Sequence, residues 1–260
     1  MQLIRHAAGS SIKPLAAYGP ALDTGAITLA SAIDDSPYYY SSGQLVKNFT
    51  AGEYRGLMTV REAIYRSQNV PAVKVLTLIT PQVGFNYLEK FGISTLVSPQ
   101  KAINGSHDIV QPLALGGMTL GVTNIDMTAA YAAIANHGTY TKPVYYTAVY
   151  DYKGNLLLDN SSSETHTVLK EQTAWLLTSA LESVITQAPV HLQLFPTSRL
   201  PVKQVRPIMK PINGSVVLHR IIRLLSGWAM MITLSFVQVY QPYKDLADDY
   251  VTDSRGTFYR

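Results

Sequence analysis

The sequence predicts an α+β fold in which helices alternate with turns and a pair of strands comes late in the chain. Residues 123–135 and 169–185 carry apolar side chains at helical spacing, which predicts two amphipathic helices. Residues 145–152 and 156–159 are β-prone and flank Lys153-Gly154-Asn155, which is typical of a hairpin turn. With 47% apolar residues among 260, the chain can bury a core of one or two domains.

The first predicted helix carries a serine and a lysine three residues apart, in Gly9-Ser10-Ser11-Ile12-Lys13-Pro14. Residues at this spacing lie on one face of a helix, one turn apart. A desolvated lysine at that place can take the proton of the Ser10 hydroxyl and make it a nucleophile. Because Pro14 has no N–H and suits a first helical turn, we expect the helix to begin near Ser10 or Ser11, with the nucleophile at the positive end of the helix dipole.

The S-x-x-K pattern alone is a weak signal, since it should occur by chance about once in a chain of this length. It occurs a second time in Ser98-Pro99-Gln100-Lys101. There Ser98 suits a helix cap and Pro99 the first helical position. That copy therefore predicts the start of a helix rather than a reactive site.

A further pair of polar residues, in Ser67-Gln68-Asn69, lies between two predicted helices. Thr59-Val60-Arg61-Glu62 is a capping box that should begin a short helix running to about Arg66, and Pro71 fits the first position of the next helix. On an ordered connection, Ser67 could pass protons while Asn69 holds a substrate carbonyl or the lysine. The alternative is that both side chains make only turn hydrogen bonds.

Three other segments predict no regular structure or leave two interpretations open. Residues 41–57 and 103–112 are loop-like in composition. The run Tyr38-Tyr39-Tyr40 either lines a groove or is packed against the core.

The composition excludes several classes of site. The chain has no cysteine, which excludes disulfides, haem attachment and cysteine-based zinc sites, and its six histidines do not fall at metal-ligand spacing. We therefore expect no metal and no cofactor. The net charge of +4 comes from residues 188–260, with nine basic and four acidic residues, whereas residues 1–187 have twelve basic and thirteen acidic. Because no basic patch interleaved with aromatic residues accompanies this charge, we expect no nucleic-acid partner.

Taken together, S-x-x-K and S-x-N resemble the active-site serine acyl transferases, in which these motifs and K-T-G line one cleft. More closely, the chain resembles the transpeptidase domain of class A, or bifunctional, penicillin-binding proteins, from about Arg5 to Gln187. Ala8 stands where that family usually has proline. The resembling stretches, in the family's order, are GSSIKPLAAYGPAL, MTVREAIYRSQNVPAVKV, LALGGMTLGVTNIDMTAAYAAIANHGTYTKP and LTSALESVIT.

The resemblance implies the fold that penicillin-binding proteins share with serine β-lactamases, and the activity of a serine D,D-transpeptidase that cross-links peptidoglycan stem peptides. Ser10 would form the acyl-enzyme, Lys13 would act as base, and Ser67 with Asn69 would relay protons and orient substrate. β-Lactams would trap the acyl-enzyme. The family is anchored at the extracytoplasmic face of the bacterial membrane. We expect neither a signal peptide nor a membrane anchor in this chain, and the apolar run 224–237 is too short to span a bilayer.

The third family motif is missing, because neither K-T-G nor K-S-G occurs in the chain and the resemblance stops after Gln187. Read at one constant base offset, with synonymous codons chosen freely, residues 187–207 can encode GTGASATFPNIPASGKTGTT, the family's expected continuation. We therefore expect residues 1–187 to be a transpeptidase domain fragment and residues 188–260 to be an out-of-frame tail. A genuine, divergent tail is the alternative.

The start of the chain leads to a similar expectation. Met1 lies just before Ser10, so the family's glycosyltransferase domain, membrane anchor and first strands should be absent. The expected fold is then incomplete, a helical cluster with a remnant of the antiparallel sheet, and the expected activity is impaired. The competing hypothesis is a non-catalytic remnant, or a binding module whose basic, apolar tail adheres to anionic surfaces.

Overall fold

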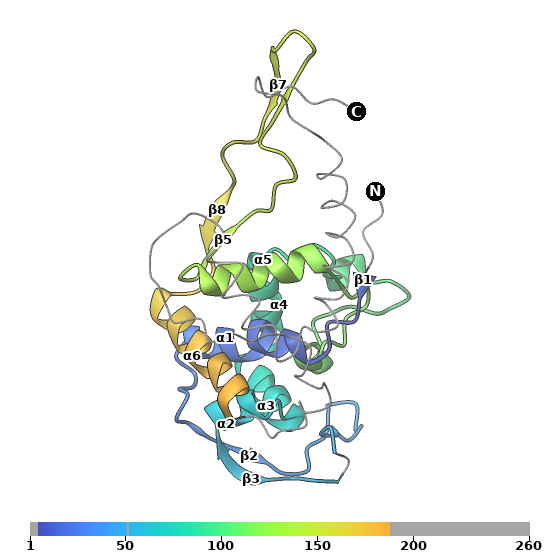
Figure 1. Ribbon diagram of the computed structural model, residues 1–260. Helices are drawn as coiled ribbons and strands as arrows, with labels where there is room; N and C mark the ends of the chain where they lie inside the picture. Colours follow the sequence, from blue (N-terminus) through green and yellow to red (C-terminus); the bar gives the residue numbers. More distant parts are fainter. Residues whose placement is uncertain (1–4, 51, 188–260) are drawn as a thin grey trace, which may run out of the picture.

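The computed structural model describes residues 5–50 and 52–187; the predicted tail 188–260 and its apolar run 224–237 lie outside the described residues. Helices form the body and antiparallel strand pairs lie at its periphery (Figure 1). The helical elements are η1 (Gly9–Ile12), η2 (Pro14–Tyr18), α1 (Gly19–Asp23), α2 (Val60–Tyr65), α3 (Asn69–Ile79), α4 (Pro81–Lys90), η3 (Pro99–Lys101), η4 (Gln111–Leu115), α5 (Asn124–Ala135) and α6 (Glu171–Gln187). The strands are β1 (Arg5–His6), β2 (Ala32–Asp35), β3 (Gly56–Thr59), β4 (Val122–Thr123), β5 (Thr139–Thr141), β6 (Ala148–Tyr150), β7 (Leu156–Asp159) and β8 (Thr165–Thr167).

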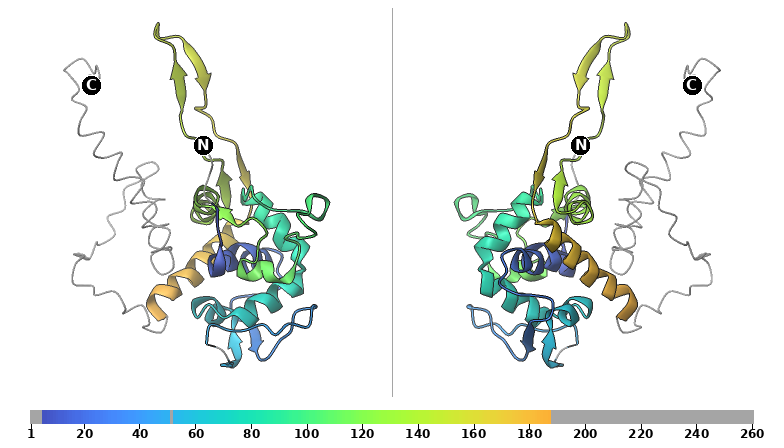
Figure 2. Two further views of the ribbon diagram at one scale, coloured as in Figure 1. Left: turned by 90° about the vertical axis from the view of Figure 1, so that its right-hand side faces the viewer. Right: turned by 90° about the vertical axis from the view of Figure 1, so that its left-hand side faces the viewer.

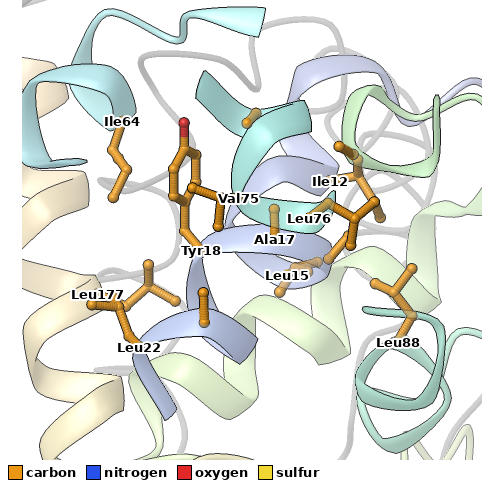
Figure 3. Packing of buried hydrophobic residues seen from close by; sticks show 14 of the residues in the cluster. Ile12, Leu15, Ala17, Tyr18, Leu22, Ile64, Val75, Leu76, Leu88 and Leu177 are labelled. Atoms are coloured by element: carbon orange, nitrogen blue, oxygen red, sulfur yellow. The ribbon is translucent and has the colours of Figure 1, made fainter. Parts of the chain in front are cut away.

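A continuous helical stretch formed by η1, η2 and α1 runs through the centre of the body. Every residue of η2 is buried, as expected for a helix that is apolar on all sides. Helices α3, α4 and α6 pack around it. Figure 3 shows the ring of Tyr18 between Ile64 of α2 and Val75 of α3, with Leu177 of α6 packed nearby. This core fixes the position of η1, which carries Ser10.

The strands of the described chain form four separate two-stranded antiparallel sheets, β1–β4, β2–β3, β5–β8 and β6–β7. In the second, Ala32 pairs with Thr59 and Asp35 with Gly56. The combination of a helical cluster with antiparallel strand pairs agrees with the predicted α+β class. The described residues contain no larger sheet.

The predicted hairpin is confirmed, with β6 and β7 as its strands. Its turn is closed by the N–H of Gly154, which donates to the carbonyl of Asp151 at 3.0 Å, and Gly154 has a φ of +84°. Strand β6 is shorter than predicted, because the ladder begins only at Ala148. The hairpin projects from the helical body (Figure 2), and its apolar side chains Tyr150, Tyr152, Leu156, Leu157 and Leu158 are exposed.

Both predicted helices are confirmed, as α5 and α6, but only α6 is amphipathic: the buried residues of α5 lie all round the helix and none of its residues is exposed, so the predicted apolar face of α5 is wrong. Thr123 caps α5, since its Oγ1 accepts the N–H of Asp126 at 3.1 Å. Helix α6 begins at Glu171, two residues later than predicted. The N–H groups of Val168 and Leu169 donate instead to the carbonyl of Gly138, which holds this segment beside the end of α5.

The tyrosine run is mostly packed. Tyr38 and Tyr40 are partly buried against the core, whereas Tyr39 is exposed. The loop-like segments are largely confirmed, although η4 begins at Gln111 inside the second of them. Within residues 5–50 and 52–187, no helix is both long and apolar enough to cross a membrane.

Candidate active site

Ser10 lies in η1, a 3₁₀ turn that begins one residue before it. In a 3₁₀ helix residues three apart are aligned, so Ser10 and Lys13 share a face. The predicted start near Ser10 is confirmed, and Pro14 does lie in a first helical turn, although it is the first turn of η2 and not that of η1, which carries Ser10. Pro14 has no N–H to donate to the Ser10 carbonyl, but that carbonyl already accepts the N–H of Lys13. The Ser10 hydroxyl is half-buried and has no hydrogen-bond partner among the described residues.

Two tertiary contacts hold this turn. Tyr131 of α5 donates its hydroxyl to the Ser11 carbonyl at 2.7 Å. On the other side, Gly116 at the end of η4 lies so close that a Cβ there would collide with the backbone nitrogen of Gly9. Gly116 also has a φ of +84°, so glycine is needed for both reasons. The backbone around Ser10 is therefore fixed by packing from two directions.

Lys13 is buried and directed at the second motif. Its side chain is 2% exposed, and its Nζ donates to three oxygens: the Ser67 carbonyl at 2.7 Å, Ser67 Oγ at 3.1 Å and Asn69 Oδ1 at 2.6 Å. No carboxylate in the described chain pairs with it. The structure thus brings Lys13, Ser67 and Asn69 together, from segments more than fifty residues apart.

Burial lowers the pKa of the Lys13 amine from its ordinary 10.5 to about 7. The cause is the loss of water around the charged form, because uncharged oxygens surround Nζ. At neutral pH about half of the molecules then carry a neutral amine that can accept a proton. A lysine three residues after a hydroxyl and tuned in this way can serve as a general base.

Ser67 reaches Lys13 because of how helix α2 ends. The N–H of Ser67 donates to the Ile64 carbonyl at 3.0 Å and the N–H of Gln68 to the Ala63 carbonyl at 3.1 Å, which is the Schellman pattern. Ser67 occupies the left-handed position of this motif with a φ of +53°, where glycine is the usual residue. This conformation turns both its carbonyl and its hydroxyl toward Lys13. The capping of α2 is as predicted, since Thr59 Oγ1 accepts the N–H of Glu62 at 3.1 Å.

Asn69 is the first residue of α3, not part of a connection before it, and Pro71 is the third residue rather than the first. The prediction failed because none of the first-turn N–H groups has a partner inside the helix, so proline is tolerated across that turn. The side chain of Asn69 lies between two segments. Its Nδ2 donates to the Lys47 carbonyl at 2.7 Å, while its Oδ1 accepts from Lys13.

Two polar residues beside this site were missed in the sequence. Asn48 Oδ1 accepts the N–H groups of Asn69 at 2.9 Å and Val70 at 3.2 Å, and so caps α3 from outside. The carboxylate of Asp35 accepts from Asn48 Nδ2 at 2.8 Å. Asn48 lies in a segment that composition identifies only as a loop, twenty-one residues before Asn69. No local pattern in the sequence marks it.

The second S-x-x-K copy is confirmed as a helix start. Ser98 precedes η3 and Pro99 takes its first position, although the Ser98 side chain makes no capping bond. Lys101 is exposed, so this copy lacks the buried amine found at Lys13. Over the described ranges, no group of three histidine, aspartate or glutamate side chains is placed to hold a metal ion.

Comparisons with known proteins identify the family of this chain. The family model for the penicillin binding protein transpeptidase domain matches residues 4–193. Penicillin-binding protein 1A of Clostridium tetani (strain Massachusetts / E88) is 34% identical over 190 residues, which are 70% of this chain and 24% of that protein. Penicillin-binding protein 4 of Bacillus subtilis (strain 168) is 34% identical over 177 residues, 68% of this chain and 27% of that protein. The chain therefore spans about a quarter of the length of these relatives.

Solved structures support the same assignment. PonA1 from Mycobacterium tuberculosis in complex with penicillin V superposes with a TM-score of 0.60 at 26% identity, over 70% of this chain and 48% of that one. The D,D-transpeptidase domain of a peptidoglycan glycosyltransferase from Eggerthella lenta gives a TM-score of 0.57 at 17% identity, over 71% and 50%. This chain belongs to the penicillin-binding protein transpeptidase domain family, which confirms the resemblance and the fold class predicted from the sequence.

Proposed function

We propose that residues 5–187 carry the acylation site of a serine D,D-transpeptidase that cross-links peptidoglycan stem peptides. One observation supports this most directly: the buried Lys13 amine is surrounded by Ser67 and Asn69 and follows Ser10 by one turn. A buried lysine without a carboxylate partner is costly to a fold, so its retention is better explained by chemistry than by packing.

The proposed reaction begins when the neutral Lys13 amine takes the proton of the Ser10 hydroxyl. Ser10 Oγ then forms a bond with the carbonyl carbon of the penultimate D-alanine, and the bond from that carbon to the terminal D-alanine nitrogen breaks. The leaving amine receives its proton from Lys13 through the Ser67 hydroxyl, which lies 3.1 Å from Nζ. An amine of a neighbouring stem peptide attacks the acyl ester, and its proton returns to Ser10 Oγ by the same groups.

Asn69 positions the Lys13 amine in this proposal. Its Oδ1 holds the Lys13 amine at 2.6 Å, and with Nδ2 engaged by Lys47 its orientation is fixed. β-Lactams would acylate Ser10 in place of the peptide, in keeping with the penicillin V complex of the related PonA1. Because the relatives are cell-wall penicillin-binding proteins, we also propose that the substrate is met at the extracytoplasmic face of the membrane.

The missing K-T-G motif should weaken this chemistry. In the family that strand supplies donors for the substrate carboxylate and backbone for the oxyanion hole. We propose that this chain, as its sequence stands, acylates slowly, and that residues 188–260 are an out-of-frame continuation of the domain. With suitable synonymous codons, insertion of one G after the Gln187 codon would create GTGASATFPNIPASGKTGTT and return the motif.

Labelling with a fluorescent penicillin tests the proposal. The parent chain should be labelled slowly, with the adduct mapped by mass spectrometry to Ser10, and Ser10→Ala and Lys13→Met should abolish it. Lys101→Met is the matched control and should label like the parent, since Lys101 is exposed. The base insertion should raise the rate by about a hundredfold or more where the chain folds. An adduct on another residue, or equal labelling of Ser10→Ala, would refute the assignment.

A further inference from the structure

Asn48 and Asp35 form a buried polar pair next to the candidate active site. Asp35 is fully buried and Asn48 is 7% exposed. One carboxylate oxygen of Asp35 accepts from Asn48 Nδ2 at 2.8 Å, and the other accepts the N–H of Arg55 at 3.1 Å. The Asn48 amide donates in addition to the Glu53 carbonyl at 3.1 Å. The carboxamide of Asn48 is therefore held on its donor side by two acceptors.

The acceptor side of the same carboxamide holds the start of α3. Asn48 Oδ1 receives the N–H groups of Asn69 and Val70, which would otherwise be unpaired at the helix end. The neighbouring Lys47 carbonyl receives the Asn69 side-chain amide. Asn69 is thus fixed at both its backbone and its side chain by residues 47 and 48.

These hydrogen bonds decide which atom of the Asn69 side chain faces Lys13. An ammonium group has only donors, so it needs the oxygen of the carboxamide and not the nitrogen. With Nδ2 bound to the Lys47 carbonyl, Oδ1 is the atom turned to Lys13 Nζ. Ser67 and Asn69 are also the residues that surround Nζ, so their position controls how much water reaches it.

We propose that Asn48, oriented by Asp35, is a positioning residue for the acylation of Ser10, acting through Asn69 on Lys13. The proposal rests on the proposed function in that Lys13 is the base. Asparagine suits the position because one side chain must both accept from helix N–H groups and donate to a carboxylate. Aspartate at position 48 would accept equally well but would set two carboxylates against each other inside the protein.

The titration of Lys13 provides a readout that general damage to the fold does not move. In full-length protein with ¹³C-labelled lysine, the Lys13 Cε resonance is assigned by its loss in Lys13→Met and followed against pH. We expect a pKa near 7 in the parent. In Asn48→Ala the start of α3 should loosen and admit water to Nζ, which should raise the pKa by about one unit or more. Such a rise would lower the neutral amine at pH 7, and with it the penicillin-labelling rate, about fivefold.

Exchanging the two side chains gives the decisive variant. Asp35→Asn alone removes the acceptor that orients Asn48, and we expect a smaller rise in the Lys13 pKa. Adding Asn48→Asp restores the hydrogen bond between positions 35 and 48 and an acceptor for the N–H groups of α3, but it sets a carboxylate against the Glu53 carbonyl and nearer to Lys13, which favours the charged amine. The double variant is therefore judged by the hydrogen-exchange protection of the Asn69 and Val70 N–H groups, which Asp35→Asn should lower and the double variant should return. This pair keeps the test decisive where Asn48→Ala does not fold.

Asp23→Asn is the matched control. Asp23 is another buried aspartate whose carboxylate accepts a backbone N–H, that of Lys170 at 2.8 Å, and it lies at the far end of the central helix, roughly 15 Å from Lys13. It should lower the melting temperature without moving the Lys13 pKa. A folded Asn48→Ala or Asp35→Asn with the parent's Lys13 pKa would overturn the proposal, as would a double variant in which the Asn69 and Val70 N–H groups stay unprotected. If the Lys13 pKa shifts in the variants as expected but Ser10 is not labelled in any protein, the parent included, the proposed function is refuted and the effect of Asn48 on Lys13 is supported.

Discussion

The burial of Lys13 predicts a specific pH dependence of stability, which Lys13→Met should remove. The unfolded chain holds a proton on Lys13 up to about pH 10.5, whereas the folded chain releases it near pH 7. Between these values the unfolded state binds more protons, so the free energy of unfolding rises with pH. The whole difference corresponds to about 5 kcal/mol at about 1.4 kcal/mol per pH unit. That stability is lacking at and below pH 7, where the folded protein must hold a buried charge.

The assay is urea unfolding of the parent and Lys13→Met at pH 7, 8 and 9. Integrated over this range, the parent should gain about 2 kcal/mol relative to the variant. Methionine leaves the Ser67 carbonyl and Asn69 Oδ1 without their donor, at about 1–3 kcal/mol each, so the comparison uses the slopes and not the absolute values. Above about pH 10 the effect is opposed by Tyr18 and Tyr131, because burial raises the pKa of both hydroxyls in the folded chain only.

Lys101→Met provides the control, because the same substitution at an exposed lysine should leave the curve parallel to the parent's. If the curves of the parent and Lys13→Met are parallel from pH 7 to 9, the amine is not neutral in the folded chain. The argument for Lys13 as the base would then fail, whatever the labelling of Ser10.

Three further substitutions test individual contacts. Ser67→Gly removes the strain of a φ of +53°, about 1–2 kcal/mol, but it also removes the Oγ that accepts from the buried Lys13 amine, at about 1–3 kcal/mol. The free energy of unfolding should therefore change by no more than about 2 kcal/mol while penicillin labelling falls, and a larger loss of stability would contradict the strain argument. Tyr18→Phe should be neutral or stabilising by about 1 kcal/mol in urea unfolding, since the buried Tyr18 hydroxyl has no partner, and a clear loss would reveal one. Thr123→Ala should cost about 1 kcal/mol by removing the cap of α5, whereas Ser98→Ala, whose side chain caps nothing, should leave the midpoint unchanged.

Much of the fold could be predicted because its signals are local. The Thr59 cap of α2, the apolar stripe of α6 and the turn at Gly154 each act within a few residues, and the structure confirms all three. The reciprocal half of the capping box is not formed, because the Glu62 carboxylate accepts from Arg66 Nε instead. The position of Pro71 could not be predicted in the same way. Proline is compatible with several first-turn positions, and the residue that sets the true start of α3 is Asn48, in another segment.

The residues of the candidate site could be predicted where a sequence motif marks them. The S-x-x-K and S-x-N patterns indicated Lys13, Ser67 and Asn69, and the structure places these three side chains in contact. The burial of Lys13, which lowers its pKa, depends on α3 packing beside the central helix and has no signature at the motif itself. The same holds for Asp35, since a lone aspartate at a strand end carries no mark of being buried.

The active site and the core make opposite contributions to stability. At pH 7 a buried, unpaired Lys13 costs about 5 kcal/mol and the left-handed Ser67 about 1–2 kcal/mol, against a net stability of about 5–15 kcal/mol for a typical domain. The apolar packing of η2 with its surrounding helices offsets this unfavourable free energy and holds Ser10 and Lys13 in place. Loss of the local contacts that join Lys13 to Ser67 and Asn69 should therefore release the site while the rest of the core stays packed. Lys13 would then regain water and a high pKa before the helices unfold, so its titration reports the integrity of the site at temperatures where the overall fold is still intact.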